Sequence, residues 1–253
     1  MLKPPSDITD RRNLHTIYDR ICQTHPPIAG VAQGAMVLRD TLINDMDTET
    51  MNSVLKPKVD GSRYLDELFS ENTLDFFIFF SSATCVTGNL GQSNYSVANM
   101  FMVGLAAQRR KRGLAGSVIN IGAILGVGYV TRETSQALQD NLLKSGHVWM
   151  SEEDFHTIFA EAILAGRPDS GLEPEIVTGL RVIYDTDKQR PLWSFNPKFQ
   201  HLVVHADGTA SDATKASGQK SVRTQLREAG SIAEAEISVQ GKFLPSSKER
   251  RDS

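Results

Sequence analysis

The chain has 253 residues, of which 40% are hydrophobic, which is enough for one α/β domain with a buried core and additional segments. A net charge of −3 gives no reason to expect a nucleic acid or a membrane surface as a partner. With two cysteines, no apolar run of about 18 residues and no signal-peptide core, the sequence predicts a cytoplasmic protein that does not span a membrane.

The first part of the sequence predicts helices and strands in alternation. A helical pattern begins after Asp10, a candidate N-cap, with apolar residues at positions 14, 17, 18, 21 and 22. Residues 27–32 are typical of a short buried strand that opens into a glycine-containing turn. Apolar residues at helical spacing predict a helix over residues 51–69, and the apolar run from residue 76 predicts a strand that ends at Ser81.

The next predicted helix carries Tyr95. We expect Val97, Phe101 and Leu105 to face inward on it. The helix closes with the basic run 109–112 and a glycine. This run is typical of a helix C-terminus whose cations face the helix dipole, and it is not interpreted as an anion site.

Residues 117–121 predict one more buried strand, followed by Gly122 and a glycine-rich turn at 126–128. Nearly continuous apolar strands that alternate with helices are typical of a parallel sheet covered on both faces. The predicted fold class is therefore α/β, with a Rossmann-like parallel sheet and helices on both faces.

Beyond the glycine-rich turn, the sequence predicts a polar-faced helix over residues 133–144. A second helix begins with a capping-box-like pattern at Ser151 and directs Phe155, Ile158 and Phe159 inward. These two helices are either a lid at the carboxyl side of the sheet or ordinary outer-layer helices. Residues 175–180 predict a final strand.

The segment around Tyr95 is the most informative part of the sequence. Tyr95 and Asn99 lie one helical turn apart on the same face, and Ser82 stands at the end of the preceding buried strand. A phenol beside a fixed serine hydroxyl can polarise a carbonyl and give it a proton while a hydride arrives from a cofactor.

Lys58 lies in the apolar stripe of the helix over residues 51–69, four residues after Val54 and three after Leu55. One interpretation is a lysine that snorkels from a kink at Pro57. The alternative is an inward ammonium that lowers the pKa of Tyr95, since a nearby cation favours the phenolate.

Together with residues 32–40, these four side chains resemble the ketoreductase domain of reducing polyketide synthases of the fungal iterative type, a branch of the short-chain dehydrogenase superfamily. Ordinary members of the superfamily carry the lysine four residues after the tyrosine. The polyketide ketoreductases exchange it with an asparagine of the neighbouring helix. Here Asn99 stands four residues after Tyr95 and Lys58 lies on the earlier helix, so this exchange carries the resemblance.

The resemblance implies that NADPH reduces a β-keto group, tethered as a thioester to an acyl-carrier protein, to a β-hydroxyl during polyketide biosynthesis. Other polyketide synthase domains are the implied partners. Tyr95 would donate the proton, Ser82 would hold the carbonyl oxygen and Lys58 would keep the phenol acidic. Asn99 would order the site or a chain of water molecules.

The implied cofactor contacts are Asp7 near the adenine, Gly34, and Gly122 near the nicotinamide, and the resemblance implies no metal ligand. Family members begin with a strand and a glycine-rich turn that binds the pyrophosphate. This sequence has no Gly-x-Gly-x-x-Gly motif before its first helix. We therefore expect the first strands and the glycine-rich loop of the domain to be missing, which leaves an exposed sheet edge.

The expected domain organisation has three parts. Residues 1–205 form the C-terminal two-thirds of a ketoreductase domain, residues 206–220 a linker, and residues 221–253 a partly disordered connector toward a carrier domain. A fragment of a larger synthase, a mispredicted gene start and a short protein that has lost the reaction all fit this organisation.

Two other functions remain open at this stage. A catalytically incompetent or structural ketoreductase fragment is favoured by the missing phosphate-binding loop. A free-standing short-chain dehydrogenase that acts on a diffusible ketone is disfavoured by the exchange of Lys58 with Asn99 and by the linker-like tail.

Overall fold

The computed structural model describes residues 7–71, 74–125 and 144–205. Nearly all of them belong to one compact unit, residues 1–183 and 187–204. Of the second unit, residues 184–186 and 205–253, only 184–186 and 205 are described, and there His205 Nδ1 lies 3.1 Å from Asp185 Oδ2. The expected turn at 126–128, most of the expected helix over 133–144 and the tail from 206 onward lie outside the described residues.

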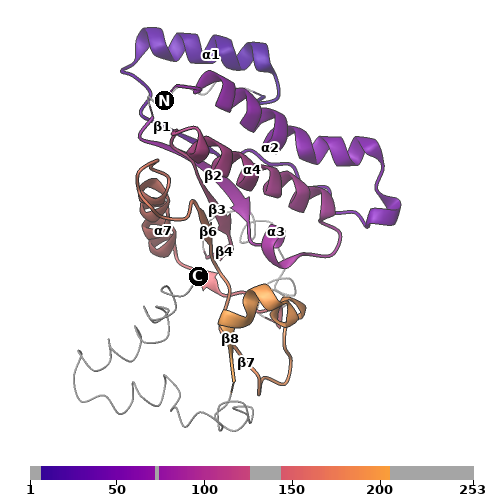
Figure 1. Cartoon of the computed structure of the whole chain (residues 1–253). Coiled ribbons are helices and arrows are strands. Elements are labelled where there is room, and N and C mark those ends of the chain that lie inside the picture. The colour runs from indigo at the N-terminus through magenta and orange to yellow at the C-terminus, as the bar shows by residue number, and fades with distance from the viewer. Residues whose placement is uncertain (1–6, 72–73, 126–143, 206–253) are drawn as a thin grey trace, which may run out of the picture. The chain divides into compact units, whose positions relative to one another are not determined.

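A four-stranded parallel sheet forms the centre of the main unit (Figure 1). Its order is β1 (Gly30–Gln33), β2 (Phe76–Ser82), β3 (Ser117–Ile121) and β6 (Glu175–Val177). All three pairings are parallel. The predicted parallel sheet is therefore confirmed. The last strand is shorter than expected because Thr178 and Gly179 leave it to contact the end of β3.

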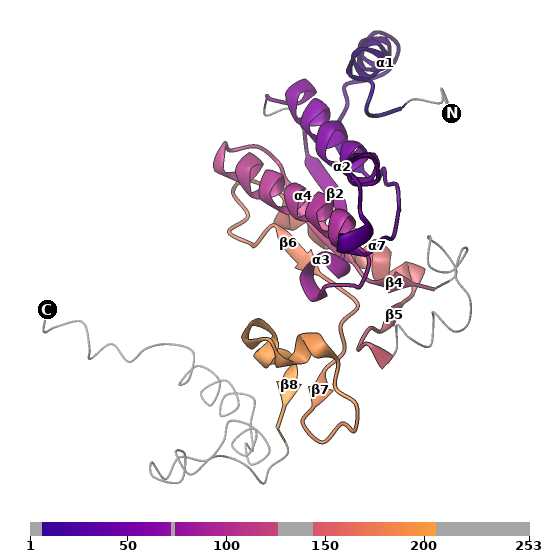
Figure 2. The same cartoon turned by 90° about the vertical axis from the view of Figure 1, so that its right-hand side faces the viewer.

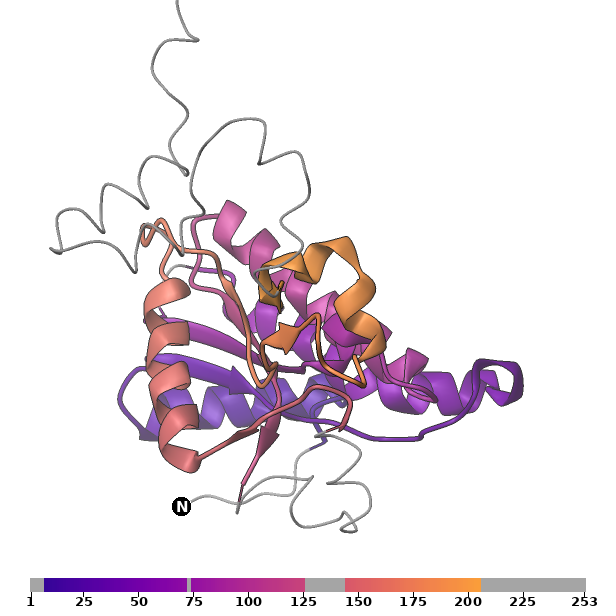
Figure 3. The same ribbon diagram turned by 90° about the horizontal axis from the view of Figure 1, so that it is seen from below.

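The helices cover both faces of this sheet, as predicted. On one face α2 (Thr48–Leu68) and α4 (Ser93–Lys111) lie side by side (Figure 2), and α1 (Arg11–Thr24) contacts α2. On the other face α7 (Glu152–Ala165) packs against β2 and β3 (Figure 3). None of the helices in the described ranges is both long and apolar enough to cross a membrane.

Shorter elements connect these layers. They are α3 (Thr84–Thr87), the strands β4 (Ala123–Ile124) and β5 (Trp149–Met150), which pair in parallel, the strands β7 (Ile183–Tyr184) and β8 (Val203–Val204), and the 3₁₀ helices η1 (Ile43–Asp45), η2 (Leu192–Phe195) and η3 (Pro197–Leu202). The short helix α3 directly follows the end of β2, so it lies at the carboxyl edge of the sheet.

Side-chain caps explain where the long helices begin. The carboxylate of Asp10 accepts a hydrogen bond from the backbone N–H of Asn13, and Asp47 caps α2 in the same way. Ser151 and Asp154 form a complete capping box at the start of α7. Because these bonds satisfy N–H groups that have no partner within the helix, the sequence-based starts at Asp10 and Ser151 are confirmed.

Strand β2 carries apolar side chains on both faces, as a central parallel strand must. Phe77 and Phe79 pack toward α4 in a cluster with Met102 and Val118. Ile78 lies in a second cluster on the opposite face. The core therefore has two layers, one on each side of the sheet.

Two expectations about the helix faces are wrong. Val97 is 51% exposed, because the inward stripe of α4 runs through Ala98, Met102 and Leu105. The lid interpretation also fails for α7: the ring of Phe155 lies 5.8 Å from that of Phe80, and the helix covers the sheet face as an outer layer.

The basic run at the end of α4 includes a buried side chain that the sequence did not indicate. Arg109 is fully buried, donates to the backbone oxygens of Ala115 and Phe69, and binds Asp66 of α2 at 2.5 Å. Its guanidinium lies 4.0 Å from the centroid of the Phe77 ring. The run does end a helix, but Arg109 joins α2, α4 and the sheet instead of facing the dipole.

We expect the substitution Arg109→Met to lower the free energy of unfolding by about 3 kcal/mol, since it leaves the buried Phe69 carbonyl and part of the Asp66 carboxylate without their donor. Arg112→Met is the matched control, because Arg112 binds the same carboxylate from a position that is 39% exposed. The loss of the Arg112 guanidinium should lower the free energy of unfolding by less than about 1 kcal/mol. Denaturant unfolding of both variants measures the difference, and equal losses would contradict the structural role of Arg109.

Candidate functional site

The carboxyl end of β2 positions Ser82. This residue pairs with Ile121 of β3 and is half-buried. Its hydroxyl oxygen accepts hydrogen bonds from the backbone N–H and the hydroxyl of Thr84, at 3.3 and 3.0 Å. The turn into α3 therefore fixes the Ser82 side chain from one side, while its own proton is available to another acceptor.

Helix α4 brings Tyr95 to the same edge. Tyr95 is 8% exposed, and its hydroxyl donates to the thioether of Met36 at 3.8 Å. Burial raises the pKa of Tyr95 above 10.0, although polar interactions with the side chains of Asn99 and Ser82 offset part of this effect. Because a thioether is a weak acceptor, the phenol can exchange Met36 for a better acceptor at little cost.

Asn99 lies one turn further along α4 and is completely buried. Its amide nitrogen donates to the backbone oxygen of Tyr95 at 2.8 Å. Its side-chain oxygen has no hydrogen-bond partner in the structure. A buried acceptor without a donor is costly, so Asn99 offers a fixed acceptor to a donor that enters the site.

Lys58 points inward from α2 and is 2% exposed, so the snorkelling interpretation is wrong. Its ammonium donates to the backbone oxygen of Phe80 at 2.8 Å and lies 5.5 Å from the centroid of the Tyr95 ring. Burial lowers the pKa of Lys58 from 10.5 to about 8, opposed by the nearby Cys85. The inward position follows from the helical stripe in which Val54, Gly61 and Ser62 are also buried.

The structure thus brings Lys58, Ser82, Tyr95 and Asn99 together, from three different elements. One electrostatic expectation is not met. The ammonium of Lys58 lies near the ring of Tyr95, yet the pKa of the phenol is raised, and the burial of the phenol is the largest cause. Tyr95 therefore keeps its proton in this structure, and its buried phenol is a weaker acid than a solvated one.

The three candidate cofactor residues make no hydrogen bond with these four side chains among those that the structure shows. Gly34 is exposed directly after β1, where a Cβ atom would come within 3.1 Å of the Phe80 ring. Gly122 follows β3, where a Cβ atom would lie 2.7 Å from the Cα atom of Gly179. The close approach of two backbones thus accounts for a glycine at position 122. Asp7 is exposed, and the hydrogen bonds from Thr9 lower its pKa.

Residues 32–40 contributed to the resemblance, but the sequence did not predict which segment they contact. The carboxylate of Asp40 accepts two hydrogen bonds from Gln92, at 3.0 and 3.1 Å, and Asn94 donates to the backbone oxygen of Arg39. These contacts hold the segment after β1 against the start of α4, next to Tyr95. No local pattern around Gln92 reveals which segment it contacts.

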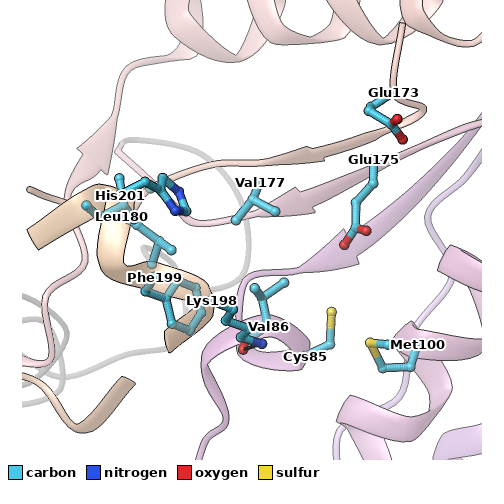
Figure 4. A pocket seen from close by; sticks show the side chains of 12 residues that line it. Cys85, Val86, Met100, Glu173, Glu175, Val177, Leu180, Lys198, Phe199 and His201 are labelled. Atoms are coloured by element: carbon cyan, nitrogen blue, oxygen red, sulfur yellow. Dashed lines mark hydrogen bonds between the residues drawn. The ribbon is translucent and has the colours of Figure 1, made fainter. Parts of the chain in front are cut away.

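A cavity of about 590 Å³ is lined by other residues and includes none of the four (Figure 4). Its lining comes from α3, α4, η3 and the segment of β6, and includes Cys85, Met100, Glu175 and Lys198. Burial raises the pKa of the Cys85 thiol, which donates to the buried Asn120. No group of three or more His, Cys, Asp or Glu side chains in the described ranges could hold a metal ion.

Comparison with known proteins identifies the family. Residues 3–126, which contain all four clustered side chains, match the family model of the KR domain. This part of the chain belongs to the KR domain family. The family expected from the exchange of Lys58 and Asn99 is therefore confirmed.

The similarity of this KR sequence to fungal synthases extends beyond the matched residues. The chain is 67% identical over 224 residues to the hybrid PKS-NRPS synthetase poxE of Penicillium oxalicum, and 52% identical over 232 residues to the polyketide synthase-nonribosomal peptide synthetase pyiS of Pyricularia grisea. The alignments cover 88% and 90% of this chain but 6% of each synthase. The chain therefore spans a small part of the length of these relatives.

Solved structures confirm the Rossmann-like fold of the chain. A structure of A-type ketoreductases from a modular polyketide synthase matches with a TM-score of 0.61 and 26% identity, over 70% of this chain and 35% of that chain. A ketoreductase domain from the bacillaene assembly line matches with the same TM-score and identity, over 69% of this chain and 41% of that chain.

The lowered pKa of Lys58 predicts a pH dependence of stability. Between about 8 and 10.5 the unfolded chain holds a proton at Lys58 that the folded chain has released, so the contribution of Lys58 makes folding more favourable as pH rises through this window. The substitution Lys58→Met removes the buried charge but keeps an apolar side chain of similar length. We expect the variant to be as stable as the unchanged protein, or more stable, at pH 7.

Relative to the variant, the unchanged protein should gain on the order of 2 kcal/mol of unfolding free energy between pH 8 and pH 10. Cys85 and Tyr95 also titrate at high pH, but they are present in both proteins, so the difference isolates Lys58. Denaturant unfolding at a series of pH values measures it. A variant that is much less stable at pH 7, with an unchanged pH profile, would show that the ammonium supports the fold.

Proposed function

We propose that this chain contributes the proton-donating part of an NADPH-dependent ketoreductase, which reduces a carrier-bound β-ketoacyl thioester to the β-hydroxyl during polyketide biosynthesis. The observation that carries the proposal is the buried ammonium of Lys58 against the face of Tyr95. Burying a charge without a carboxylate beside it opposes folding, and such groups occur preferentially at functional sites.

The four clustered side chains take complementary roles in this proposal. The Ser82 hydroxyl donates to the carbonyl oxygen of the substrate and orients it. Tyr95 exchanges its contact with Met36 for that oxygen and gives up its proton to it. Lys58 stabilises the phenolate that this transfer leaves, and Asn99 offers its free acceptor oxygen to a donor that restores the proton.

NADPH, when bound, supplies the hydride. Gly34 and Asp7 are both exposed, so each can contact the cofactor. Gly34, directly after β1, offers its backbone, and Asp7 offers its carboxylate. Gly122 stands at the end of β3, the side of a parallel sheet where ligands bind. We propose these three residues as contacts to the two ends of the dinucleotide.

The proposed context is a cytoplasmic multidomain synthase, in which other polyketide synthase domains and a carrier protein supply the substrate. Residues 1–205 would be ketoreductase, residues 206–220 a linker and residues 221–253 a connector toward the carrier domain. The support for this context is the similarity of most of the chain to fungal hybrid synthases.

The alternative function is a ketoreductase segment that does not catalyse the reaction by itself. One specific observation favours it: no Gly-x-Gly-x-x-Gly motif occurs anywhere in the 253 residues. Such a motif places backbone N–H groups and a helix N-terminus against the cofactor's pyrophosphate. The two functions differ in whether the chain alone binds NADPH.

The role of Tyr95 is tested in a protein that joins this chain to the glycine-rich strand–turn–helix units of a KR domain. Tyr95→Phe should lower the turnover of a simple β-ketoacyl thioester by ~10²-fold or more, since it removes the general acid. Tyr64→Phe is the matched control, because Tyr64 lies on α2 and faces Arg11. Near-normal turnover by Tyr95→Phe would remove Tyr95 from the mechanism.

Cofactor binding by the 253-residue chain alone is tested by titration calorimetry. We expect weak binding of NADPH, because the proposed contacts at Asp7, Gly34 and Gly122 address only the two ends of the dinucleotide. Micromolar affinity in a monomeric sample would contradict this expectation and would show that the chain can bind its cofactor without a further phosphate-binding loop.

A further inference from the structure

Gln33, the last residue of β1, has a polar side chain that the proposed mechanism does not use. The residue is 1% exposed. Its amide nitrogen donates to the backbone oxygen of Pro57 at 2.7 Å, and it lies 3.4 Å from the hydroxyl of Ser62. Its amide oxygen accepts from the backbone N–H of Ala35 at 2.7 Å. Both ends of this buried amide are therefore engaged, each with a different segment.

The bond to Pro57 meets α2 at its internal proline. A proline inside a helix has no N–H group, so the carbonyl four residues earlier, that of Ser53, loses its usual intrahelical donor. Lys58 is the next residue. The turn that directs the ammonium inward thus lacks one bond of the helical ladder, and Gln33 attaches the same turn to the sheet from outside.

The bond to Ala35 holds the segment that contacts Tyr95. Ala35 precedes Met36, whose thioether accepts the hydrogen bond of the Tyr95 hydroxyl. One side chain, that of Gln33, therefore holds both the turn that carries Lys58 and the segment that contacts the Tyr95 hydroxyl.

We propose that Gln33 is a positioning residue, which fixes the Lys58 ammonium against Tyr95 by joining the Pro57 turn of α2 to the segment after β1. The proposal rests on the proposed role of Lys58 in ketoreduction. The positioning of Lys58 by Gln33 follows from the hydrogen bonds of Gln33, and it can be tested without a measurement of ketoreduction.

The test is an NMR titration of Lys58 in the 253-residue chain labelled at lysine side-chain carbons. Gln33→Met keeps the volume of the side chain but removes its three polar contacts. With the turn released, water reaches the ammonium and its burial decreases, so the pKa of Lys58 should rise from about 8 toward 10.5, by about one unit or more. Cys85 and Tyr95, which face Lys58 from α3 and α4, are unchanged.

Ser117→Ala is the matched control. Ser117 is also completely buried, and its hydroxyl donates to the backbone oxygen of Ala162 at 2.7 Å, which joins β3 to α7 on the opposite face of the sheet. Both variants should unfold at lower temperature than the unchanged protein, since each leaves a buried backbone oxygen with one donor fewer. Only Gln33→Met should change the pKa of Lys58.

A second substitution tests the weak-turn argument. Pro57→Ala restores the missing N–H group, so the helix can hold the Lys58 turn by itself. In the double variant with Gln33→Met, the pKa of Lys58 should return at least halfway to its original value. If Gln33→Met does not yield folded protein, Gln33→Asn replaces it in both measurements, because it keeps a buried amide but draws the donor back by one methylene group.

An unchanged pKa of Lys58 in the Gln33 variant, together with a loss of thermal stability like that of Ser117→Ala, would overturn the proposal and leave Gln33 as a satisfied core amide. This outcome is distinct from a failure of the ketoreductase proposal, which depends on the turnover of Tyr95→Phe and can occur with the titration result intact.

Discussion

The burial of the Lys58 ammonium is the constraint on which the geometry of the site depends. A buried lysine without an ion-pair partner is rare, because its charge loses hydration that a single hydrogen bond does not replace. Here the charge receives the backbone oxygen of Phe80 and the face of the Tyr95 ring. An apolar residue would pack at this position at lower cost, and buried charges of this kind occur preferentially at functional sites.

The position of the ammonium in turn depends on how α2 and α4 lie on the sheet. Buried polar side chains hold this layer at both ends. Near the carboxyl edge of the sheet, Gln33 and Lys58 attach α2 to β1 and β2. At the far end, Arg109 of α4 binds Asp66 of α2 and the backbone that follows it. Because each end is held by a buried polar side chain, the distance between Lys58 and Tyr95 is set by the packing of the whole layer.

The four clustered residues occupy a small part of the molecule, separate from the other face of the sheet and from the cavity beside β6. Helix α7 covers the sheet with phenylalanine side chains that pack on β2. The cavity places Cys85 and Glu175 near each other through the buried amide of Asn120. The four clustered residues belong to neither region. They gather where β2 ends, as expected for a site at the carboxyl edge of a parallel sheet.

Local patterns in the sequence determined the order of helices and strands, the parallel sheet and the spacing of Tyr95 and Asn99, because helical and strand periodicity and capping depend on residues only a few positions apart. The apolar stripe of the helix predicted over residues 51–69 indicated that Lys58 faces inward. Only the tertiary structure decided that burial raises the pKa of Tyr95, that Val97 is exposed and that Arg109 and Gln33 join distant segments. The bonds of Gln33 and Arg109 join residues 24 and 43 positions apart, and the burial of Tyr95 likewise depends on segments distant in the sequence, which no local pattern encodes.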